Sequence, residues 1–257
     1  AQDSRRRLRR RTARVMAASA LGTRSIALAV VGLVAGGCYP AAVTREGRSI
    51  GALYDFVFVL SLIVVAIVWG LLTVAILRYR RRGRADGGAE LPPQIGGHTG
   101  LEAVWTGIPL LTVGVIFALT LAVLGEVERP PSSDRVELHV EAFRWGWRIS
   151  YPAEAVSVEG FLDPGPQAVV PVGRPLLITL TSADVVHAFY VPQFLYKRDA
   201  VPGRPQSFEV TVEQAGIYGG QCAEFCGLFH ARMPFSIRAV PTAEYEAWLL
   251  AQRAPRP

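Results

Sequence analysis

The stretch Cys222-Ala-Glu-Phe-Cys226-Gly-Leu-Phe-His230-Ala-Arg-Met233 contains two thiols, an imidazole and a thioether within twelve residues. Thiolate and thioether sulfur together with imidazole nitrogen is the ligand set of copper sites that transfer electrons. Two cysteines could bridge two metal ions. A second imidazole is expected upstream, and His187, in Ser182-Ala-Asp-Val-Val-His187, is the best candidate. The stretch therefore favours a copper-binding domain.

Two other interpretations of the cysteines remain open on spacing alone. Two cysteines in an exported domain most often form a disulfide, and a spacing of four also places them on one face of a helix. A disulfide gives no reason for His230 and Met233 to follow, and Met is scarce, with only two in the chain. A zinc site would use Cys and His but not Met. Ligand softness favours copper.

The residues around this stretch predict an all-β domain. From Arg135 the hydrophobic pattern alternates, and Pro and Gly separate the alternating segments. The segments predicted as strands are Val136–Phe143, Leu176–Thr181, Ser207–Val212 and Phe235–Val240. A Cys/His/Met loop near the last strand favours a cupredoxin-like Greek-key β-barrel or sandwich. Thr242 is expected to cap a short final helix over 243–252.

Two apolar stretches precede the β domain. Residues 56–77 carry no charge, and about 20 apolar residues suffice to span a bilayer as a helix. A second apolar stretch covers 104–124, with Pro109 in its first turns, where proline is tolerated best. The loop 78–103 starts with an Arg cluster and is therefore expected on the cytoplasmic side. The sequence predicts a two-helix membrane anchor and an extracytoplasmic β domain.

The N-terminus is typical of an export signal. Seven Arg between Arg5 and Arg14 precede the apolar run 15–37, and small residues stand before Cys38. Cleavage before Cys38 would leave that cysteine to carry a lipid. The formal net charge of +6 arises in this segment, because residues 1–37 hold eight Arg and one Asp. A nucleic-acid partner is therefore not expected. The predicted domains are the signal 1–37, the membrane anchor 38–128, the copper domain 129–241 and the helix with its tail 242–257.

The pattern Cys-x-Glu-x-Cys-Gly-x-x-His-x-x-Met, with Ser-x-Asp-Val-x-His upstream, resembles the binuclear CuA site of cytochrome c oxidase subunit II. The resemblance covers about 54–240 and fills every ligand position. It implies that Cys222 and Cys226 bridge two coppers and that His187 and His230 bind one copper each. Met233 and the backbone carbonyl of Glu224 are implied as weak outer ligands.

Three further roles follow from the resemblance, each beside a simpler structural interpretation. The Glu224 side chain would reach a magnesium ion shared with the catalytic subunit, or it is a solvated loop carboxylate. Trp145 would accept electrons from cytochrome c. An alternating strand would instead place Trp145 and Trp147 on one face as core residues. Glu102 would mark a proton-path entrance, or it stabilises the N-terminus of its helix. Asp184 and Arg232 receive no redox role.

The resemblance implies subunit II of a bacterial respiratory oxidase in the plasma membrane. Such a subunit takes electrons from cytochrome c at CuA and passes them to haem in subunit I, where oxygen reduction is coupled to proton pumping. Other oxidase subunits are further expected partners. The alternatives are the CuA domain of a nitrous-oxide-reductase-like enzyme, a quinol oxidase subunit without the copper ligands, and a copper-binding lipoprotein without redox turnover.

Overall fold

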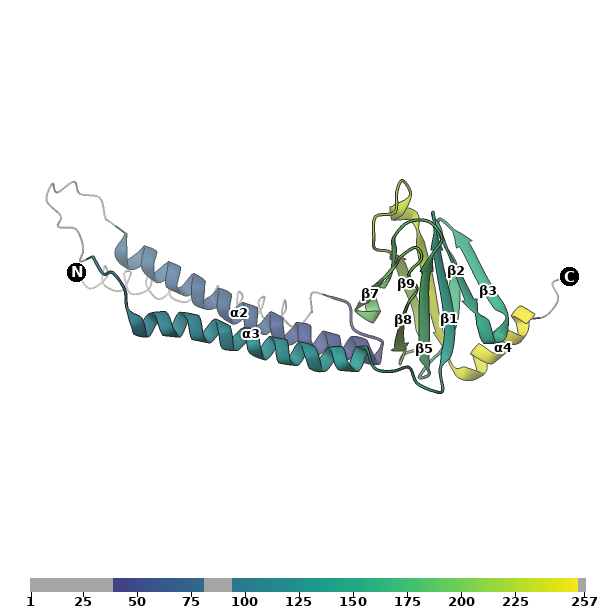
Figure 1. Cartoon of the computed structure of the whole chain (residues 1–257), viewed down its shortest axis with the longest axis horizontal. Coiled ribbons are helices and arrows are strands. Elements are labelled where there is room, and N and C mark those ends of the chain that lie inside the picture. The colour runs from purple at the N-terminus through teal and green to yellow at the C-terminus, as the bar shows by residue number, and fades with distance from the viewer. Residues whose placement is uncertain (1–38, 81–93, 254–257) are drawn as a thin grey trace, which may run out of the picture. The chain divides into compact units, whose positions relative to one another are not determined.

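The computed structural model describes residues 39–80 and 94–253 (Figure 1). The predicted signal, Cys38 with its predicted lipid, and most of the Arg cluster lie outside these ranges, as does the end of the C-terminal tail. The described part contains two long helices followed by ten strands and a final short helix. The predicted architecture, an all-β domain behind two apolar helices, is confirmed.

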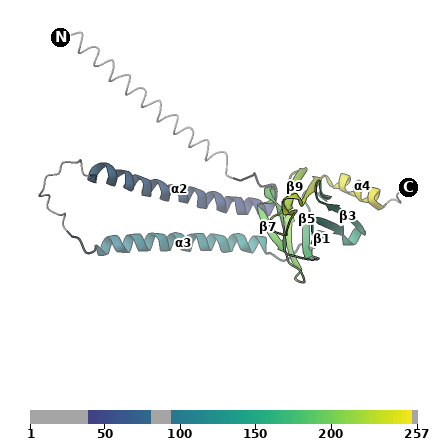
Figure 2. The same cartoon turned by 90° about the horizontal axis from the view of Figure 1, so that it is seen from above.

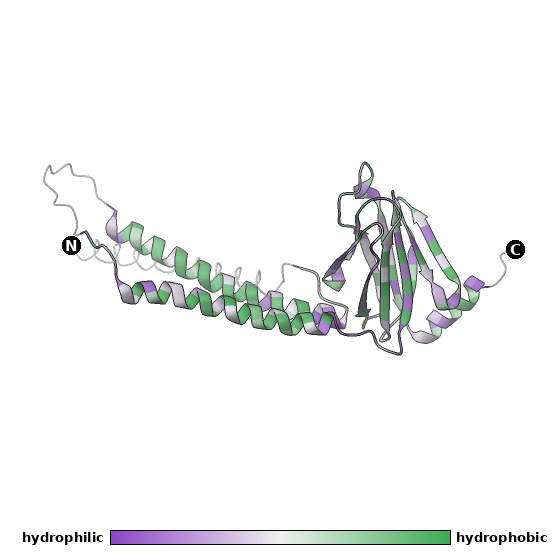
Figure 3. Cartoon of the chain, viewed as in Figure 1, coloured by the Kyte–Doolittle hydropathy of each residue, from purple (hydrophilic) through white to green (hydrophobic). Residues whose placement is uncertain are grey.

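Helices α2 (Arg45–Tyr79) and α3 (Thr99–Val127) are both long and apolar enough to cross a membrane. Their apolar residues run along most of each helix, with polar residues concentrated towards the ends (Figure 3). The helices lie side by side in both views (Figures 1 and 2). Ser49 Oγ, near the start of α2, donates a 2.6 Å hydrogen bond to Glu126, near the end of α3. The pair is therefore antiparallel.

Both helices extend beyond the predicted apolar spans, because polar side chains cap their first turns. At the start of α2, the Thr44 side chain caps the helix by accepting a 3.0 Å hydrogen bond from the backbone N–H of Gly47. At the start of α3, the His98 ring accepts from the N–H of Leu101, and the Glu102 carboxylate accepts from the N–H of His98. These contacts satisfy amides that a helix start leaves unpaired.

The β domain is a sandwich of two five-stranded sheets. One sheet has the order β3-β2-β1-β5-β8 and the other the order β4-β10-β9-β6-β7. Chain neighbours are often not sheet neighbours, and β1 pairs with β5, and β4 with β10, in parallel. The strand bounds are β1 Val136–Phe143, β2 Gly146–Tyr151, β3 Val156–Phe161, β4 Gln167–Pro171, β5 Pro175–Ser182, β6 His187–Val191, β7 Tyr196–Ala200, β8 Gln206–Thr211, β9 Gly216–Cys222 and β10 Pro234–Val240.

The core of the sandwich is aromatic where it approaches the metal-ligand stretch. Trp147, Phe189 and Phe235 are almost completely buried, and the Phe189 and Phe235 rings stack with centroids 4.5 Å apart. The Trp147 ring meets Phe235 edge-on at 5.1 Å. Helix α4 (Thr242–Arg253) packs against β3 and β4 and buries Tyr245 and Leu249. The predicted helix over 243–252 matches α4 within one residue at each end.

Candidate metal centre

The candidate ligands come from two neighbouring strands and the loop that follows one of them. Strand β9 ends at Cys222 and β10 starts at Pro234, so the loop between them carries the remaining residues of the stretch. Strand β6 begins at His187 and pairs with β9, with Phe189 opposite Cys222. This pairing brings His187, 35 residues earlier in the chain, next to the cysteine.

The glycine after Cys226 allows the loop to turn back on itself. Gly227 has φ +115°, a conformation that residues with a side chain rarely adopt. A short 3₁₀ turn, η3 (His230–Arg232), follows and returns the chain to Met233. The loop is tied to its base by the backbone hydrogen bond from Cys222 N–H to the Met233 carbonyl, at 3.1 Å. Phe225 and Leu228 project outward and are 79% and 82% exposed.

The two thiols each lie beside one imidazole. Cys222 Sγ is 3.7 Å from His187 Nδ1, and Cys226 Sγ is 3.6 Å from His230 Nδ1. The two sulfur atoms are 3.8 Å apart. Met233 Sδ lies 3.8 Å from Cys226 Sγ, and the Glu224 carbonyl oxygen lies 3.2 Å from Cys222 Sγ. All the predicted copper ligands therefore converge on one place.

These distances fit metal ligands and not a disulfide. The sulfur atoms of a disulfide are about 2.05 Å apart, whereas the 3.8 Å separation observed here leaves room for metal between them. Zinc–sulfur bonds, for comparison, are about 2.3 Å long, and two thiolates on one tetrahedral ion with such bonds stand at about this separation. The ligand atoms of His187, Cys222 and Cys226 all lie within 4.8 Å of one another, and all three residues are buried. The donor set is soft, as copper requires.

The electrostatics of the thiols also call for a cation. Burial opposes ionisation of Cys222, but hydrogen bonds, led by the one with His187, outweigh it and lower the pKa of this thiol. Burial and the negative charge on Cys222 raise the pKa of Cys226. Two adjacent thiolates are therefore unfavourable without additional positive charge. A bound metal ion would supply that charge, since thiolate is the ligating form of cysteine.

Asp184 is the contact that the sequence interpretation missed. The Asp184 Oδ1 atom accepts a 2.9 Å hydrogen bond from His187 Nε2, which leaves Nδ1 of the fully buried ring free to bind metal. Burial alone would raise the pKa of Asp184, but hydrogen bonds from His187 and from backbone amides hold it at about 2. The sequence pattern Asp-x-x-His could have indicated this hydrogen bond. The two side chains meet, however, only because the chain turns just before β6.

The two tryptophans contact the loop from different places. Trp147 lies on β2, is fully buried and donates from Nε1 to the Met233 carbonyl at 3.2 Å. Trp145 lies in the turn between β1 and β2, not in a strand, so placing both rings on one strand face was wrong. A two-residue turn interrupts the alternation. The Trp145 indole donates to the Cys226 carbonyl at 3.3 Å and packs edge-on against Phe229.

Two predicted acidic residues lie in other surroundings. The Glu224 carboxylate is half-exposed and forms an ion pair with Lys197, with Nζ 3.3 Å from Oε2. Glu102 is exposed in the first turn of α3, where its carboxylate accepts the His98 amide at 3.1 Å. The structure therefore places the Glu224 backbone at the metal cluster and Glu102 in a helix cap.

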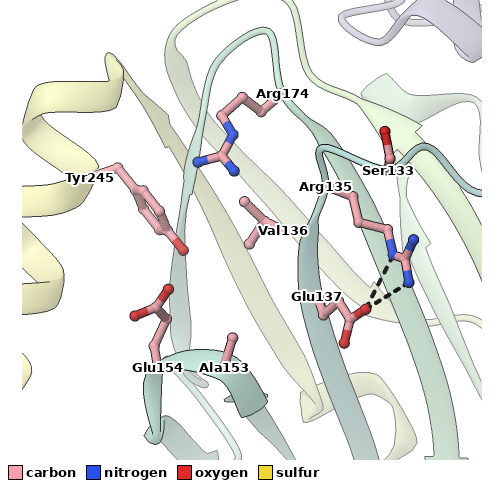
Figure 4. Close-up of a pocket in the computed structure, with 8 residues that line it drawn as sticks. All are labelled: Ser133, Arg135, Val136, Glu137, Ala153, Glu154, Arg174 and Tyr245. Carbon is pink, nitrogen blue, oxygen red and sulfur yellow. Dashed lines mark hydrogen bonds and ion pairs between the residues drawn. The ribbon is translucent and has the colours of Figure 1, made fainter.

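A separate surface cavity of about 350 Å³ lies near the start of β1 (Figure 4). Its charged groups are already paired: Arg135 with Glu137, Arg174 with Asp134, and Glu154 with Arg253. It is lined by Ser133, Arg135, Val136, Glu137, Ala153, Glu154, Arg174 and Tyr245. With no unpaired charged group on its lining, it is a weaker candidate than the metal cluster.

Comparison with known proteins points to one family. Residues 145–240 match the model of the family "Cytochrome C oxidase subunit II, periplasmic domain". A probable cytochrome c oxidase subunit 2 of Streptomyces avermitilis is 31% identical over 248 residues, covering 82% of this chain and 77% of that protein. Quinol oxidase subunit 2 of Bacillus spizizenii is 29% identical over 232 residues, covering 87% and 70%. The periplasmic domain of cytochrome oxidase subunit II of Bradyrhizobium japonicum is 31% identical, with a TM-score of 0.45 over 48% of this chain and 96% of that domain.

Proposed function

The chain belongs to the cytochrome c oxidase subunit II family, and we propose that it is the subunit through which electrons reach the oxidase. It takes single electrons from cytochrome c and passes them to haem in subunit I, where oxygen is reduced to water and protons are pumped. The observation that supports this function is the pairing of each thiol sulfur with one imidazole nitrogen, at 3.7 Å and 3.6 Å.

The ligand set fits a binuclear copper centre of the CuA type. Cys222 and Cys226 would bridge the two ions, and His187 and His230 would each hold one. Met233 and the Glu224 carbonyl would be weak outer ligands. When bound, a thiolate-bridged copper pair shares one unpaired electron, so it accepts and releases an electron with little change in bond length. The chain holds these ligands on strand ends and on a loop tied to them, which limits their movement.

The surrounding residues supply access and exclude water. Trp145 is partly exposed and hydrogen-bonded to the Cys226 carbonyl, so it would conduct the electron from cytochrome c towards the ligands. Trp147 seals the inner side of the cluster. The Glu224 carboxylate would share a magnesium ion with subunit I and would then give up its contact with Lys197. Glu102 would stand at the entrance of a proton path.

The membrane arrangement supports the same function. The antiparallel α2 and α3 would cross a bacterial plasma membrane, with the loop between them in the cytoplasm and the copper domain outside. The other oxidase subunits would pack against the apolar helix surfaces. Cys38, at the end of the predicted export signal, would carry a lipid. Mass spectrometry of the native chain tests this: a diacylglycerol on Cys38 supports it, and an intact segment 1–37 refutes it.

The copper content tests the function directly. The purified full chain should bind two coppers, and its electron paramagnetic resonance spectrum should show one electron shared by two copper nuclei. His187→Asn, Cys222→Ser and Cys226→Ser should each abolish that signal. His139→Asn is the matched control, because His139 lies in the same domain and contacts Thr181 instead of the cluster. A single copper with a four-line spectrum would contradict the binuclear centre.

Two alternatives give different results. A copper-binding lipoprotein without turnover would bind metal but would not accept electrons from reduced cytochrome c in the assembled complex. A quinol oxidase subunit, as in the Bacillus spizizenii relative, would not need the copper ligands, and this chain has all of them. Fast reduction of the copper centre by cytochrome c, followed by haem reduction, separates these functions.

A further inference from the structure

One carboxylate connects a buried metal ligand to a charged surface turn. The Asp184 Oδ1 atom accepts from His187 Nε2 at 2.9 Å, and its Oδ2 atom accepts from the Arg144 backbone N–H at 2.8 Å. The Arg144 guanidinium also reaches Oδ2, with Nε at 3.2 Å. Oδ1 also accepts from the Val185 backbone N–H at 2.6 Å. Oδ1 therefore faces the metal ligand and its own turn, whereas Oδ2 faces the β1–β2 turn.

These hydrogen bonds link three residues, His187, Asp184 and Arg144, from the interior of the domain to its surface. The His187 side chain is 0% exposed, that of Asp184 is 24% exposed, and that of Arg144 is 51% exposed. The charge of Asp184 lies next to a fully buried ligand and is mostly shielded from water, so it acts more strongly on the charge of the metal than the half-exposed Arg144 does. The positive charge of Arg144 partly offsets the negative charge of Asp184.

The two imidazoles of the site are not equivalent. Among the described residues, no carboxylate forms a hydrogen bond or ion pair with His230. Its ring is partly exposed and faces Phe225, with centroids 5.8 Å apart. Only His187 therefore has a negatively charged partner on its distal nitrogen, which increases the electron density that the ring donates.

We propose that Asp184 and Arg144 form a charge pair that sets the reduction potential of the metal centre through His187. The proposal rests on the function proposed above. Asp184 favours the oxidised centre, which carries one more positive charge, and Arg144 moderates that effect. Asp184 also fixes the proton on Nε2, so Nδ1 remains the ligand atom. Both are positioning residues, because they act on the metal through His187.

The two members of the pair should shift the potential in opposite directions. Asp184→Asn keeps an oxygen for His187 but removes the negative charge, so the reduction potential should become more positive. Arg144→Gln removes the compensating positive charge, so the potential should become more negative. A purely structural role would loosen the site in both variants and would not produce opposite signs. Arg144→Lys retains the charge and should stay near wild type.

The experiment is a spectroscopic redox titration of the copper centre in the purified full chain. Arg148→Gln is the matched control: Arg148 lies on the same hairpin, is similarly exposed at 45%, and pairs with Glu141 and Glu159 away from the cluster. The reduction potential of the copper centre in Arg148→Gln should match wild type. All the variants should still bind two coppers. Shifts in the same direction, unchanged potentials, or an equal shift in Arg148→Gln would overturn the proposal. A wild-type chain without the two-copper signal would instead overturn the proposed function.

Discussion

The two tryptophans of the β1–β2 hairpin show how neighbouring residues of one type acquire different roles. Trp147 is fully buried, and its indole shares the Met233 carbonyl with the Cys222 amide. Trp145 is only partly buried, and its indole reaches the carbonyl of the other cysteine. One ring therefore belongs to the core, and the other lies between the ligand loop and solvent. Core packing and electron transfer can be tested separately.

Trp145→Phe should slow electron transfer from cytochrome c to the copper centre severely, because the partly exposed indole and its bond to the Cys226 carbonyl are lost. Copper content and the later transfer to haem should stay near wild type, since phenylalanine retains most of the packing volume. Stopped-flow or flash-induced reduction of the assembled oxidase resolves these steps.

Trp147→Phe is the control for that measurement. This variant should lose stability, while electron transfer from cytochrome c to the copper centre stays near wild type. It should lower the free energy of unfolding by about 1–3 kcal/mol, because the buried side chain shrinks and a hydrogen bond to a carbonyl is lost. Unchanged electron-transfer kinetics in Trp145→Phe would assign Trp145 a packing role only.

At the scale of the elements, the pairing of β9 with β10 depends on a residue without a side chain. Gly220 is buried opposite Phe235, and a Cβ there would lie 2.3 Å from the Phe235 ring. That ring stacks on Phe189 and meets Trp147. The glycine therefore lets a large aromatic side chain lie across β9, directly before the strand delivers Cys222.

Gly220→Ala should destabilise the chain by about 1–3 kcal/mol, because the Phe235 ring must shift within a packed core. Thermal unfolding of the detergent-solubilised chain measures the effect. Gly219→Ala is the matched control: its Cβ would meet nothing within 4 Å, so its unfolding temperature should stay close to wild type. Equal unfolding temperatures for the two variants would show that Phe235 adapts without strain.

At the scale of the whole molecule, the start of α2 is joined to the β domain by a buried carboxylate. Glu46 is 7% exposed, and its Oε2 accepts a 2.8 Å hydrogen bond from the Thr211 amide at the end of β8. Arg45 and Arg48 form ion pairs with Glu213 just beyond. Strand β8 is an edge of its sheet, so this contact also satisfies an edge amide that no neighbouring strand pairs.

Glu46→Ala should leave the buried Thr211 amide without an acceptor, at a cost of about 1–3 kcal/mol. Hydrogen exchange of β8 in the purified full chain should become faster, while β9 and β10 keep their protection. Glu46→Gln retains an acceptor oxygen and should protect β8 nearly as well as the native residue. Unchanged exchange in Glu46→Ala would mean that the helix start does not stabilise this edge.

The sequence by itself predicted the two apolar helices, the four strands with clear alternation and the residues proposed here as copper ligands. These features are local: hydrophobic period, length and the chemistry of the donor atoms are readable from neighbouring residues. The other six strands were not predicted. Strands β4 and β6, for example, are five residues long and buried on both faces, so their hydrophobic residues do not alternate. The lengths of α2 and α3 were underestimated, since polar end residues continue a helix once caps satisfy its first amides.

Only the tertiary structure decided how distant residues meet. The pairing of β6 with β9 places His187 beside Cys222, and the turn before β6 places Asp184 against His187. The same folding puts Trp145 in a turn against the Cys226 carbonyl and Arg144 on Asp184. Donor type is a property of a residue, but ligand geometry depends on strand pairing across 35 or more positions, and no local pattern encodes that pairing.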